Sequence, residues 1–104
     1  MRKYAETLAN YVGEKSFKRV GNHTVELWLI LHYASYLDDT TYEVKRVKNA
    51  TRVFRYHDNT ICIVNDNTKQ FWLSHAGWFT TSTTQAINSY REYFSRLGYK
   101  CMTD

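Results

Sequence analysis

Histidines beside hydroxyl residues are the pattern in this chain that could support acid–base chemistry. His57 precedes Asp58 at the end of a strand-like run, and His75 follows Ser74 at the end of another. If those strand ends are neighbours in space, an imidazole would lie beside a hydroxyl, which nucleophilic catalysis requires. No nucleophile elbow or oxyanion-hole motif accompanies them. The favoured interpretation is that both histidines end strands and face solvent, so we expect no enzymatic activity.

Metal binding is the second chemistry that these residues suggest. The spacing of His57, Asp58 and His75 matches no ligand motif. The two cysteines, Cys62 and Cys101, lack C-x-x-C spacing and form neither a metal site nor a disulfide framework. Cys62 lies in an apolar run, where a free thiol behaves as a small hydrophobic residue. We therefore expect no metal and no cofactor.

Hydroxyl residues before the C-terminal helix could bind an anion, because the N–H groups of a helix start are unpaired and the helix dipole favours negative charge. The candidate anion site consists of Thr80, Thr81, Ser82 and Thr83. No Gly-Lys-Thr string is present, so this is not a nucleotide-hydrolysing loop. The favoured alternative for this turn is helix capping, with Trp78 as an anchor in the core. Residues 80–84 offer several N-caps, and Ser82 with Gln85 fits a capping box.

Basic residues interleaved with aromatic residues form the third candidate site. Arginines and aromatic rings on an exposed sheet face suit the backbone and bases of nucleic acid. The candidate contacts to nucleic acid or a partner are Lys45, Arg46, Lys48, Arg52, Arg55, Tyr56 and Lys69. Strand alternation does not place all of them on one face. Solvated charges that protect a sheet edge are the alternative, and both interpretations stay open.

Size and composition bound the class of protein. The 104 residues predict a single domain, 1–104. An apolar content of 43% and an aromatic content of 16% indicate a globular chain rather than a disordered one. The formal charge of +4 is compatible with an anionic partner, but many proteins with that charge bind no nucleic acid. The longest apolar run, residues 27–31, is too short to span a bilayer, so we expect a cytoplasmic protein without membrane contact.

Two helices are predicted from apolar periodicity. Residues 2–16 place four apolar side chains on one face and have Gly13 as a stop. A second helix begins after the hydroxyl residues and ends at Gly98, with Tyr99 supplying the hydrophobic contact of a Schellman ending. Its apolar stripe consists of Ile87, Tyr90, Tyr93, Phe94 and Leu97. The tail 100–104 is expected to be frayed.

Strand-like runs fill the middle of the chain, separated by turn residues. The predicted strands are 25–33, 41–48, 51–57, 60–65 and 70–75, with the apolar run 60–65 in the centre of the sheet. The predicted turns are 21–23, 38–40, 57–59 and 66–68. The order of elements predicts an α+β fold, with an antiparallel four- to five-stranded sheet and an N-terminal and a C-terminal helix packed on one face.

Four segments of the chain form a further pattern: residues 52–61, Phe71-Trp72-Leu73, Gly77-Trp78-x-Thr80-x-Ser82-x-Thr84 with Ile87-Asn88, and upstream Gly21-Asn22-His23-Thr24. This pattern resembles that of a group of small, uncharacterised bacteriophage proteins. The resemblance implies a phage or prophage origin and carries no catalytic residues. Members often have a second glycine where this chain has Ala76, and basic residues where it has Phe79, Ser82 and Gln85. If those basic residues contact phosphate, this chain would do so less well.

The sequence thus predicts a non-catalytic phage-type binding protein that contacts nucleic acid through a basic, aromatic sheet face. The alternative is a phage accessory protein that uses tyrosine and tryptophan anchors to bind and inhibit a host defence complex, such as CRISPR–Cas. Homodimerisation is left open. The aromatic residues serve either a binding surface or the covering of a core, and composition does not separate these uses.

Overall fold

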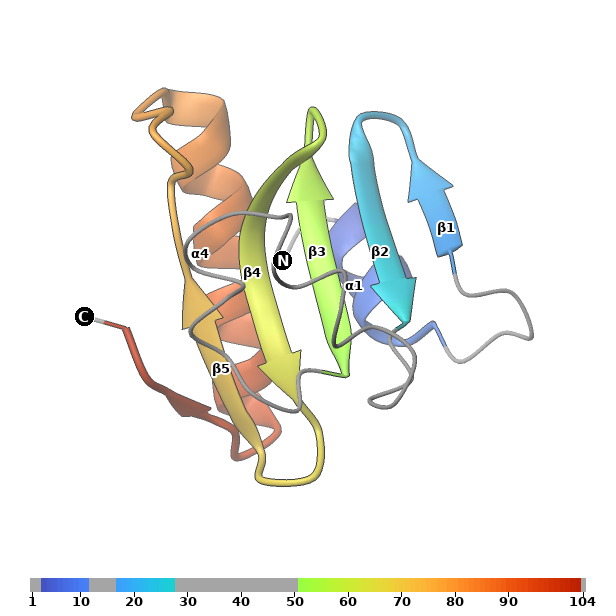
Figure 1. The fold of residues 1–104 in the computed structure, drawn as a ribbon, viewed down its shortest axis with the longest axis vertical. Coiled ribbons are helices and arrows are strands. Elements are labelled where there is room, and N and C mark those ends of the chain that lie inside the picture. Colours follow the sequence, from blue (N-terminus) through green and yellow to red (C-terminus); the bar gives the residue numbers. More distant parts are fainter. Residues whose placement is uncertain (1–2, 12–16, 28–50, 104) are drawn as a thin grey trace, which may run out of the picture.

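A six-stranded sheet is the centre of the molecule. The computed structural model describes residues 3–11, 17–27 and 51–103. In chain order the elements are α1 (Lys3–Ala9), β1 (Phe17–Val20), β2 (His23–Leu27), β3 (Arg52–Tyr56), β4 (Asn59–Asn65), β5 (Gln70–Leu73), α4 (Thr81–Arg96) and β6 (Lys100–Cys101) (Figure 1). The strands lie side by side in the order of the chain, antiparallel except for the parallel pair β5 and β6.

The predicted α+β class and the largely antiparallel sheet are confirmed, but the strand count is wrong. The described residues form six strands because Phe17–Val20 pairs with β2 and Lys100–Cys101 pairs with β5. Both additions are short edge strands, whose pairing depends on a neighbour rather than on their own periodicity. Of the predicted strands 25–33 and 41–48, residues 28–33 and the whole of 41–48 lie outside the described residues, together with the turn 38–40 and Gly13.

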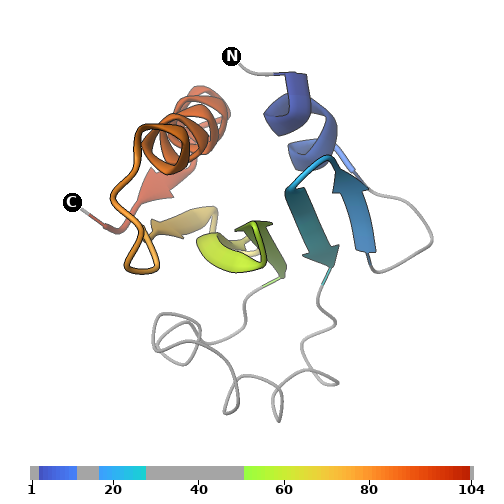
Figure 2. The same cartoon turned by 90° about the horizontal axis from the view of Figure 1, so that it is seen from above.

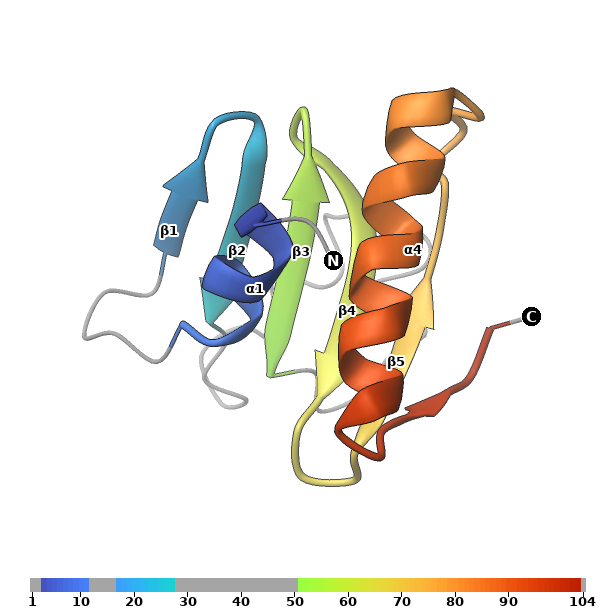
Figure 3. The ribbon, with the colours of Figure 1, turned by 180° about the vertical axis from the view of Figure 1, so that it is seen from behind.

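The predicted placement of the helices also needs correction. Helix α1 ends at Ala9 instead of extending to residue 16. It packs on β1 and β2, whereas α4 packs on β4, β5 and β6 (Figures 2 and 3). The two helices touch each other between these halves of the sheet. Each helix therefore covers its own part of the sheet. Helix α1 covers β1 and β2, and helix α4 covers β4, β5 and β6.

Aromatic side chains fill the space between α4 and the sheet. Tyr90, Phe94, Phe54 and Phe71 are fully buried. The centroid of the Phe54 ring lies 4.6 Å from that of Tyr90 and 5.7 Å from that of Phe94. The rings meet at the tilted and edge-to-face angles that aromatic pairs prefer. The stripe predicted for α4 is confirmed at Ile87, Tyr90 and Phe94, while Leu97 is 55% exposed and lies beyond the core.

Strand β4 is central, as predicted, and its register explains a local irregularity. Its four residues 61–64 are all buried, because both faces of this strand are covered. The pairing with β3 shifts by one residue between Phe54 and Arg55, which leaves Ile61 as the extra residue of a bulge. At the β3–β4 turn His57 and Asp58 adopt left-handed backbone with φ of 49° and 64°. The bulge and turn together re-aim the side chains at this end of the sheet.

The C-terminal segment is ordered, so the expectation of a frayed tail is wrong. Helix α4 ends in the predicted Schellman arrangement, in which the Tyr99 amide donates to the Phe94 carbonyl at 3.0 Å and the Gly98 amide to Ser95 at 3.1 Å. The tail then runs along β5, where the Met102 amide donates to the Phe71 carbonyl at 2.8 Å. The Leu73 amide donates to the Thr103 hydroxyl at 3.0 Å. These bonds satisfy the outer edge of β5.

Candidate binding pocket at the start of helix α4

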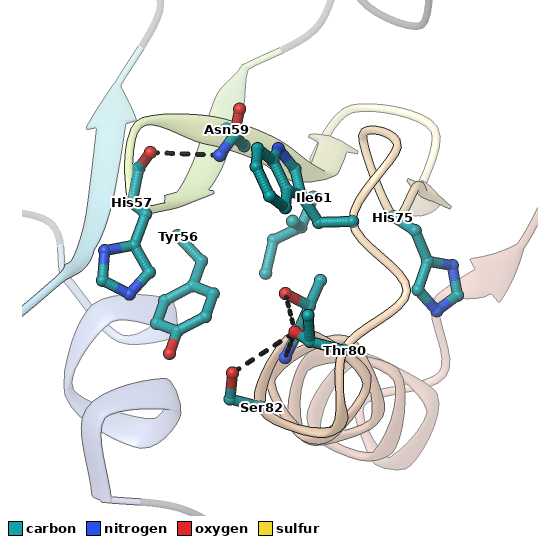
Figure 4. Close-up of a pocket in the computed structure, with 9 residues that line it drawn as sticks. Tyr56, His57, Asn59, Ile61, His75, Thr80 and Ser82 are labelled. Carbon is teal, nitrogen blue, oxygen red and sulfur yellow. Dashed lines mark hydrogen bonds between the residues drawn. The ribbon is translucent and has the colours of Figure 1, made fainter.

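A pocket of about 400 Å³ opens where the β3–β4 turn faces the start of α4 (Figure 4). Its volume lies within the range of roughly 300–1,000 Å³ that is usual for small-molecule sites. The residues that line it are Tyr56, His57, Asn59, Ile61, His75, Trp78, Thr80, Ser82 and Thr83. They come from two segments of the chain, residues 56–61 and 75–83. The pocket therefore unites Tyr56 of the predicted sheet surface with three of the four hydroxyl residues of the predicted anion site.

The sheet side of the pocket combines an apolar wall with polar edges. Ile61 is 1% exposed and belongs to the hydrophobic core cluster. The Asn59 side chain donates from Nδ2 to the His57 carbonyl at 3.1 Å (Figure 4). This bond holds the amide beside the pocket. Tyr56 and His57 lie next to each other on this side, with ring centroids 4.3 Å apart.

A stack of rings fixes the orientation of Tyr56. The His23 ring of β2 lies 3.5 Å from the Tyr4 ring of α1 and 4.5 Å from the Tyr56 ring, nearly parallel to both. The column crosses from α1 over β2 to β3, and Tyr56 is its member at the pocket. Parallel rings held from two neighbouring elements cannot easily rotate, so the pocket has a preformed aromatic wall.

The loop between β5 and α4 presents exposed aromatic rings. The Ser74 hydroxyl accepts a hydrogen bond from the Ala76 amide at 3.0 Å, and the Trp78 amide donates to the His75 carbonyl at 2.8 Å. Ala76 and Gly77 have φ of 52° and 85°, so this tight turn uses left-handed backbone. Trp78 is 56% exposed, and the prediction that it anchors the core is wrong. The turn directs the indole away from the core that α4 and β4 already fill.

Phe79 is the most exposed large apolar side chain among the described residues, at 80%. Its ring stacks on His75, with centroids 4.6 Å apart. Together with Trp78 it forms a pair of exposed aromatic residues on the loop before α4, of which Trp78 lines the pocket. Exposed apolar residues that occur singly need no explanation, but adjacent ones beside a pocket are typical of an interaction surface.

The start of α4 is capped by Thr80, one of the candidate N-caps in residues 80–84, and not by the capping box of Ser82 and Gln85. The Thr80 Oγ1 accepts from the Thr83 amide at 3.3 Å and donates to the Thr83 hydroxyl at 2.9 Å. The Ser82 hydroxyl is 3.4 Å from Thr80 Oγ1, a long contact. Thr81 does not line the pocket. Capping thus uses the Thr80 and Thr83 hydroxyls of the candidate anion site and leaves Ser82 exposed beside the pocket.

The two histidines lie on opposite sides of the pocket and do not form a pair. His57 lies beside Tyr56, whereas His75 lies on the far side, on the loop that leads to α4 (Figure 4). The Nε2 atom of His75 is 3.4 Å from the Thr84 hydroxyl, and Ser74 is bonded to its own loop. Among the described residues, no group of three His, Cys, Asp or Glu side chains could hold a metal ion.

Arg52 belongs to a closed network at the opposite end of β3. Its Nε and Nη2 donate to the two carboxylate oxygens of Asp66 at 2.8 and 2.6 Å, and its Nη1 donates to the Ala9 carbonyl. Asp66 also accepts from the Thr51 and Tyr99 hydroxyls. The Arg52 side chain is only 11% exposed, so it holds the fold together instead of facing a phosphate.

The network shifts the acidities of its members. Burial alone would raise the pKa of Asp66, but hydrogen bonds from Arg52, Thr51 and Tyr99 outweigh burial and hold the pKa below its usual value. Burial and the hydrogen bond to Asp66 raise the pKa of Tyr99. Elsewhere, burial raises the pKa of the Cys62 thiol, so this cysteine is an unreactive core residue. Cys62 and Cys101 are both free thiols.

The remaining basic candidates are dispersed. Arg55 lies 3.6 Å from Glu26 and its side chain is 19% exposed, while the Lys69 ammonium lies 4.9 Å over the Tyr99 ring. Val53 and Ile63, which pair across β3 and β4 outside the helix-side core cluster, are 0% and 1% exposed. The centre of the sheet is therefore covered on both faces. Lys45, Arg46 and Lys48 lie outside the described residues.

Arg19 is a cation beside the β3–β4 turn that the sequence patterns did not single out. Its Nη2 lies 3.8 Å from Asp58, the residue after His57, and its Nη1 donates to the Gly21 carbonyl at 3.3 Å. The β1–β2 and β3–β4 turns are joined by a hydrogen bond from the His57 amide to the Asn22 carbonyl at 2.9 Å. The pairing of the two turns helps to bring Arg19 to the β3–β4 turn, and no spacing rule reveals it.

Comparisons with models of protein families, with curated proteins and with solved structures find no match for this chain. No helix in the described part of the chain has both the length and the apolar character needed to cross a membrane. The functional assignment therefore depends on the geometry of the pocket and its surroundings.

Proposed function

We propose that this protein is a non-catalytic binding protein that contacts single-stranded nucleic acid at the pocket end of the sheet. The observation that carries the proposal is the convergence of Tyr56, Trp78 and the α4 hydroxyl residues on one pocket. Aromatic rings stack on bases of any sequence, and hydroxyl groups hydrogen-bond base edges or phosphates. The proposed surface differs from the predicted basic sheet face, because Arg52 and Arg55 are engaged in ion pairs.

Charge supports the same end of the molecule. The chain carries a formal charge of +4, and Arg19 provides a guanidinium beside the β3–β4 turn. The side chains of Arg19 and Asp58 are 50% and 84% exposed, so their contact is an exposed ion pair of little energy. A backbone phosphate can replace Asp58 as the partner of Arg19 at small cost. The separation of His57 from His75 supports binding rather than catalysis.

Arg19→Gln is the variant that tests this proposal, and Arg96→Gln is its matched control. Arg96 is an exposed arginine paired with Glu92 on the last turn of α4, about 24 Å along the helix from the pocket. Fluorescence anisotropy of labelled single-stranded DNA and RNA is measured over a salt series. The affinity of the unmodified protein is expected to fall with salt, and Arg19→Gln is expected to reduce the salt slope by about one. Arg96→Gln is expected to leave the slope unchanged.

Absence of binding to every DNA and RNA at low salt would rule out a nucleic-acid function. If Arg19→Gln and Arg96→Gln change the salt slope equally, the phosphate contact lies elsewhere on the surface. Circular dichroism of both variants checks that the fold is intact, which is expected because each substitution removes only exposed contacts.

The second candidate function is inhibition of a host defence complex, such as CRISPR–Cas, by a phage-encoded protein. The observation that favours it is the exposure of Trp78 and Phe79 on adjacent positions. Tryptophan and other large aromatic residues are typical anchors of protein interfaces. Purified defence complexes are incubated with the protein and with Phe79→Ala, and complex formation is followed by gel filtration. Loss of a complex in Phe79→Ala, with nucleic-acid binding unchanged, would favour this function.

A further inference from the structure

We propose that the pocket between Tyr56 and the start of α4 takes one unpaired nucleobase of a bound strand, an inference that rests on the nucleic-acid function above. A base is a planar, apolar ring with a hydrogen-bonding edge. The pocket offers a matching combination, with rings and an aliphatic wall on one side and neutral polar groups on the other. A volume of about 400 Å³ accommodates a single nucleotide rather than a stack of several.

The apolar part of the pocket supplies the surfaces for stacking. Tyr56 is held in place by the ring stack with His23 and Tyr4, and Ile61 closes the wall beside it. Trp78, more than half exposed, lines the same pocket from the opposite segment. A base that enters between these segments removes exposed indole surface from water without displacing any core residue. The site is preformed, because the rings on the sheet side are already immobilised.

The polar groups around the pocket are neutral and suit a base edge better than a charged group. Ser82 is exposed and makes only a 3.4 Å contact with Thr80. The Asn59 Nδ2 donates one N–H to the His57 carbonyl, which holds this amide beside the pocket. Asn59 and Ser82 come from opposite sides of the pocket, as Figure 4 shows. Donors and acceptors at two edges of a slot recognise a planar heterocycle that carries both.

Duplex nucleic acid does not fit this site. The pocket lies at the end of the sheet between a turn and a helix start, so a base must leave its stack to enter. Unstacking costs least in a single strand, and the aromatic walls replace the lost neighbours. The pocket therefore predicts a preference for single strands over duplexes, and for strands with bases over strands without them.

The experiment compares a 12-residue thymidine oligonucleotide with an oligonucleotide of the same length and charge that has abasic sites throughout. The unmodified protein is expected to bind the thymidine strand about tenfold or more tightly. Ser82→Trp places an indole in the mouth of the pocket and is expected to bring this ratio close to one, with the salt dependence retained. Ser95→Trp is the matched control, because Ser95 is an exposed serine on the same helix, away from the pocket. It is expected to keep the ratio.

The outcomes distinguish a failure of the base pocket from a failure of the nucleic-acid function. Equal, salt-dependent binding of both strands by the unmodified protein overturns the base pocket and leaves the nucleic-acid function intact. Binding of neither strand overturns the nucleic-acid function. A base preference that survives in Ser82→Trp, with the folded state verified by circular dichroism, places base recognition outside this pocket and overturns the inference. Thymidine monophosphate that binds as tightly as the strand identifies a free-nucleotide site and overturns the strand assignment.

Discussion

The two ends of strand β3 use their polar groups in opposite ways. At the Arg52 end, a guanidinium, a carboxylate, two hydroxyls and a main-chain carbonyl satisfy one another. A pocket of about 450 Å³ also lies there, and both Arg52 and Asp66 line it. At the Tyr56 end, Ser82 makes only a 3.4 Å contact with Thr80, and two large aromatic residues face solvent.

This difference shows that charge in a sheet is a poor guide to a binding surface. An arginine whose donors are engaged gains little from a ligand, since a new contact must first break a buried ion pair. Neutral groups with spare hydrogen-bonding capacity gain more. We therefore expect the Arg52 end to stabilise the fold and the Tyr56 end to bind the ligand. Variants at each end test these two expectations.

Asp66→Asn is expected to produce the largest effect. It leaves the mostly buried Arg52 guanidinium without its counter-charge, and removing one partner of such a pair costs about 3 kcal/mol of unfolding free energy. The control is Asp58→Asn at the exposed pair of the pocket end, which is expected to change stability by less than about 0.5 kcal/mol. Urea unfolding measures both. Similar losses in the two variants would remove the distinction between the ends.

The Asp66 network also predicts a pH dependence. The pKa of Asp66 in the folded state lies below its usual value of 3.8, so the unfolded chain binds this proton more tightly than the folded one. The stabilisation is fully present above about pH 4, the usual range for an aspartate, and is lost as the pH falls through the lower, folded pKa. The stability difference between the unmodified protein and Asp66→Asn should therefore shrink below pH 4. A difference that stays constant down to pH 2 would argue against the network.

Trp78→Ala is expected to separate binding from stability at the pocket end. Loss of a stacking ring should weaken binding of a single-stranded oligonucleotide about tenfold. The unfolding free energy should change by less than about 0.5 kcal/mol, because the indole is more than half exposed. Leu97→Ala is the matched control, a 55% exposed apolar residue after the far end of α4. If both variants bind like the unmodified protein, Trp78 is not part of the surface.

Thr80→Ala is expected to have the smallest effect, and it sharpens the comparison because Thr80 belongs to both the pocket and the helix. Removing the hydroxyl that caps α4 should cost about 1 kcal/mol of unfolding free energy. Thr80→Ser retains an oxygen at the same place and should recover most of that stability. Thermal unfolding of the two variants measures the difference. Equal stabilities would mean that the Thr80 hydroxyl does not cap the helix.

Local signals account for the parts of the fold that the sequence predicted well. Helix α4 combines a periodic apolar stripe, a hydroxyl residue at its start and Gly98 after its end, so each signal lies within one or two turns of the helix. Strand β4 is predicted for a similar reason, because four consecutive apolar residues between two turns suit a central strand. The predicted capping box began at Ser82, two residues after the observed cap Thr80, because several neighbouring hydroxyl residues can serve as the N-cap.

Contacts between distant segments account for the parts that were predicted wrongly or missed. Strand β6 exists because Lys69 and Phe71 offer carbonyls to the tail, and nothing within Lys100–Cys101 signals a strand. The exposure of Trp78 follows from the tight turn before it and from a core already filled by α4. Arg19 lies beside the β3–β4 turn because β1 pairs with β2 and the two turns are bonded to each other.

The sequence by itself determined the α+β class, the central strand β4 and the helix α4, because periodicity and capping are properties of neighbouring residues. It also identified Tyr56, Thr80, Ser82 and Thr83 as residues of interest, although in separate candidate sites. Only the tertiary structure decided that these residues share a pocket and that Arg52 is locked to Asp66. The physical reason is that a pocket or an ion pair forms only where particular strand ends meet. Which strand ends meet depends on the chain topology, which joins residues that are far apart in the sequence.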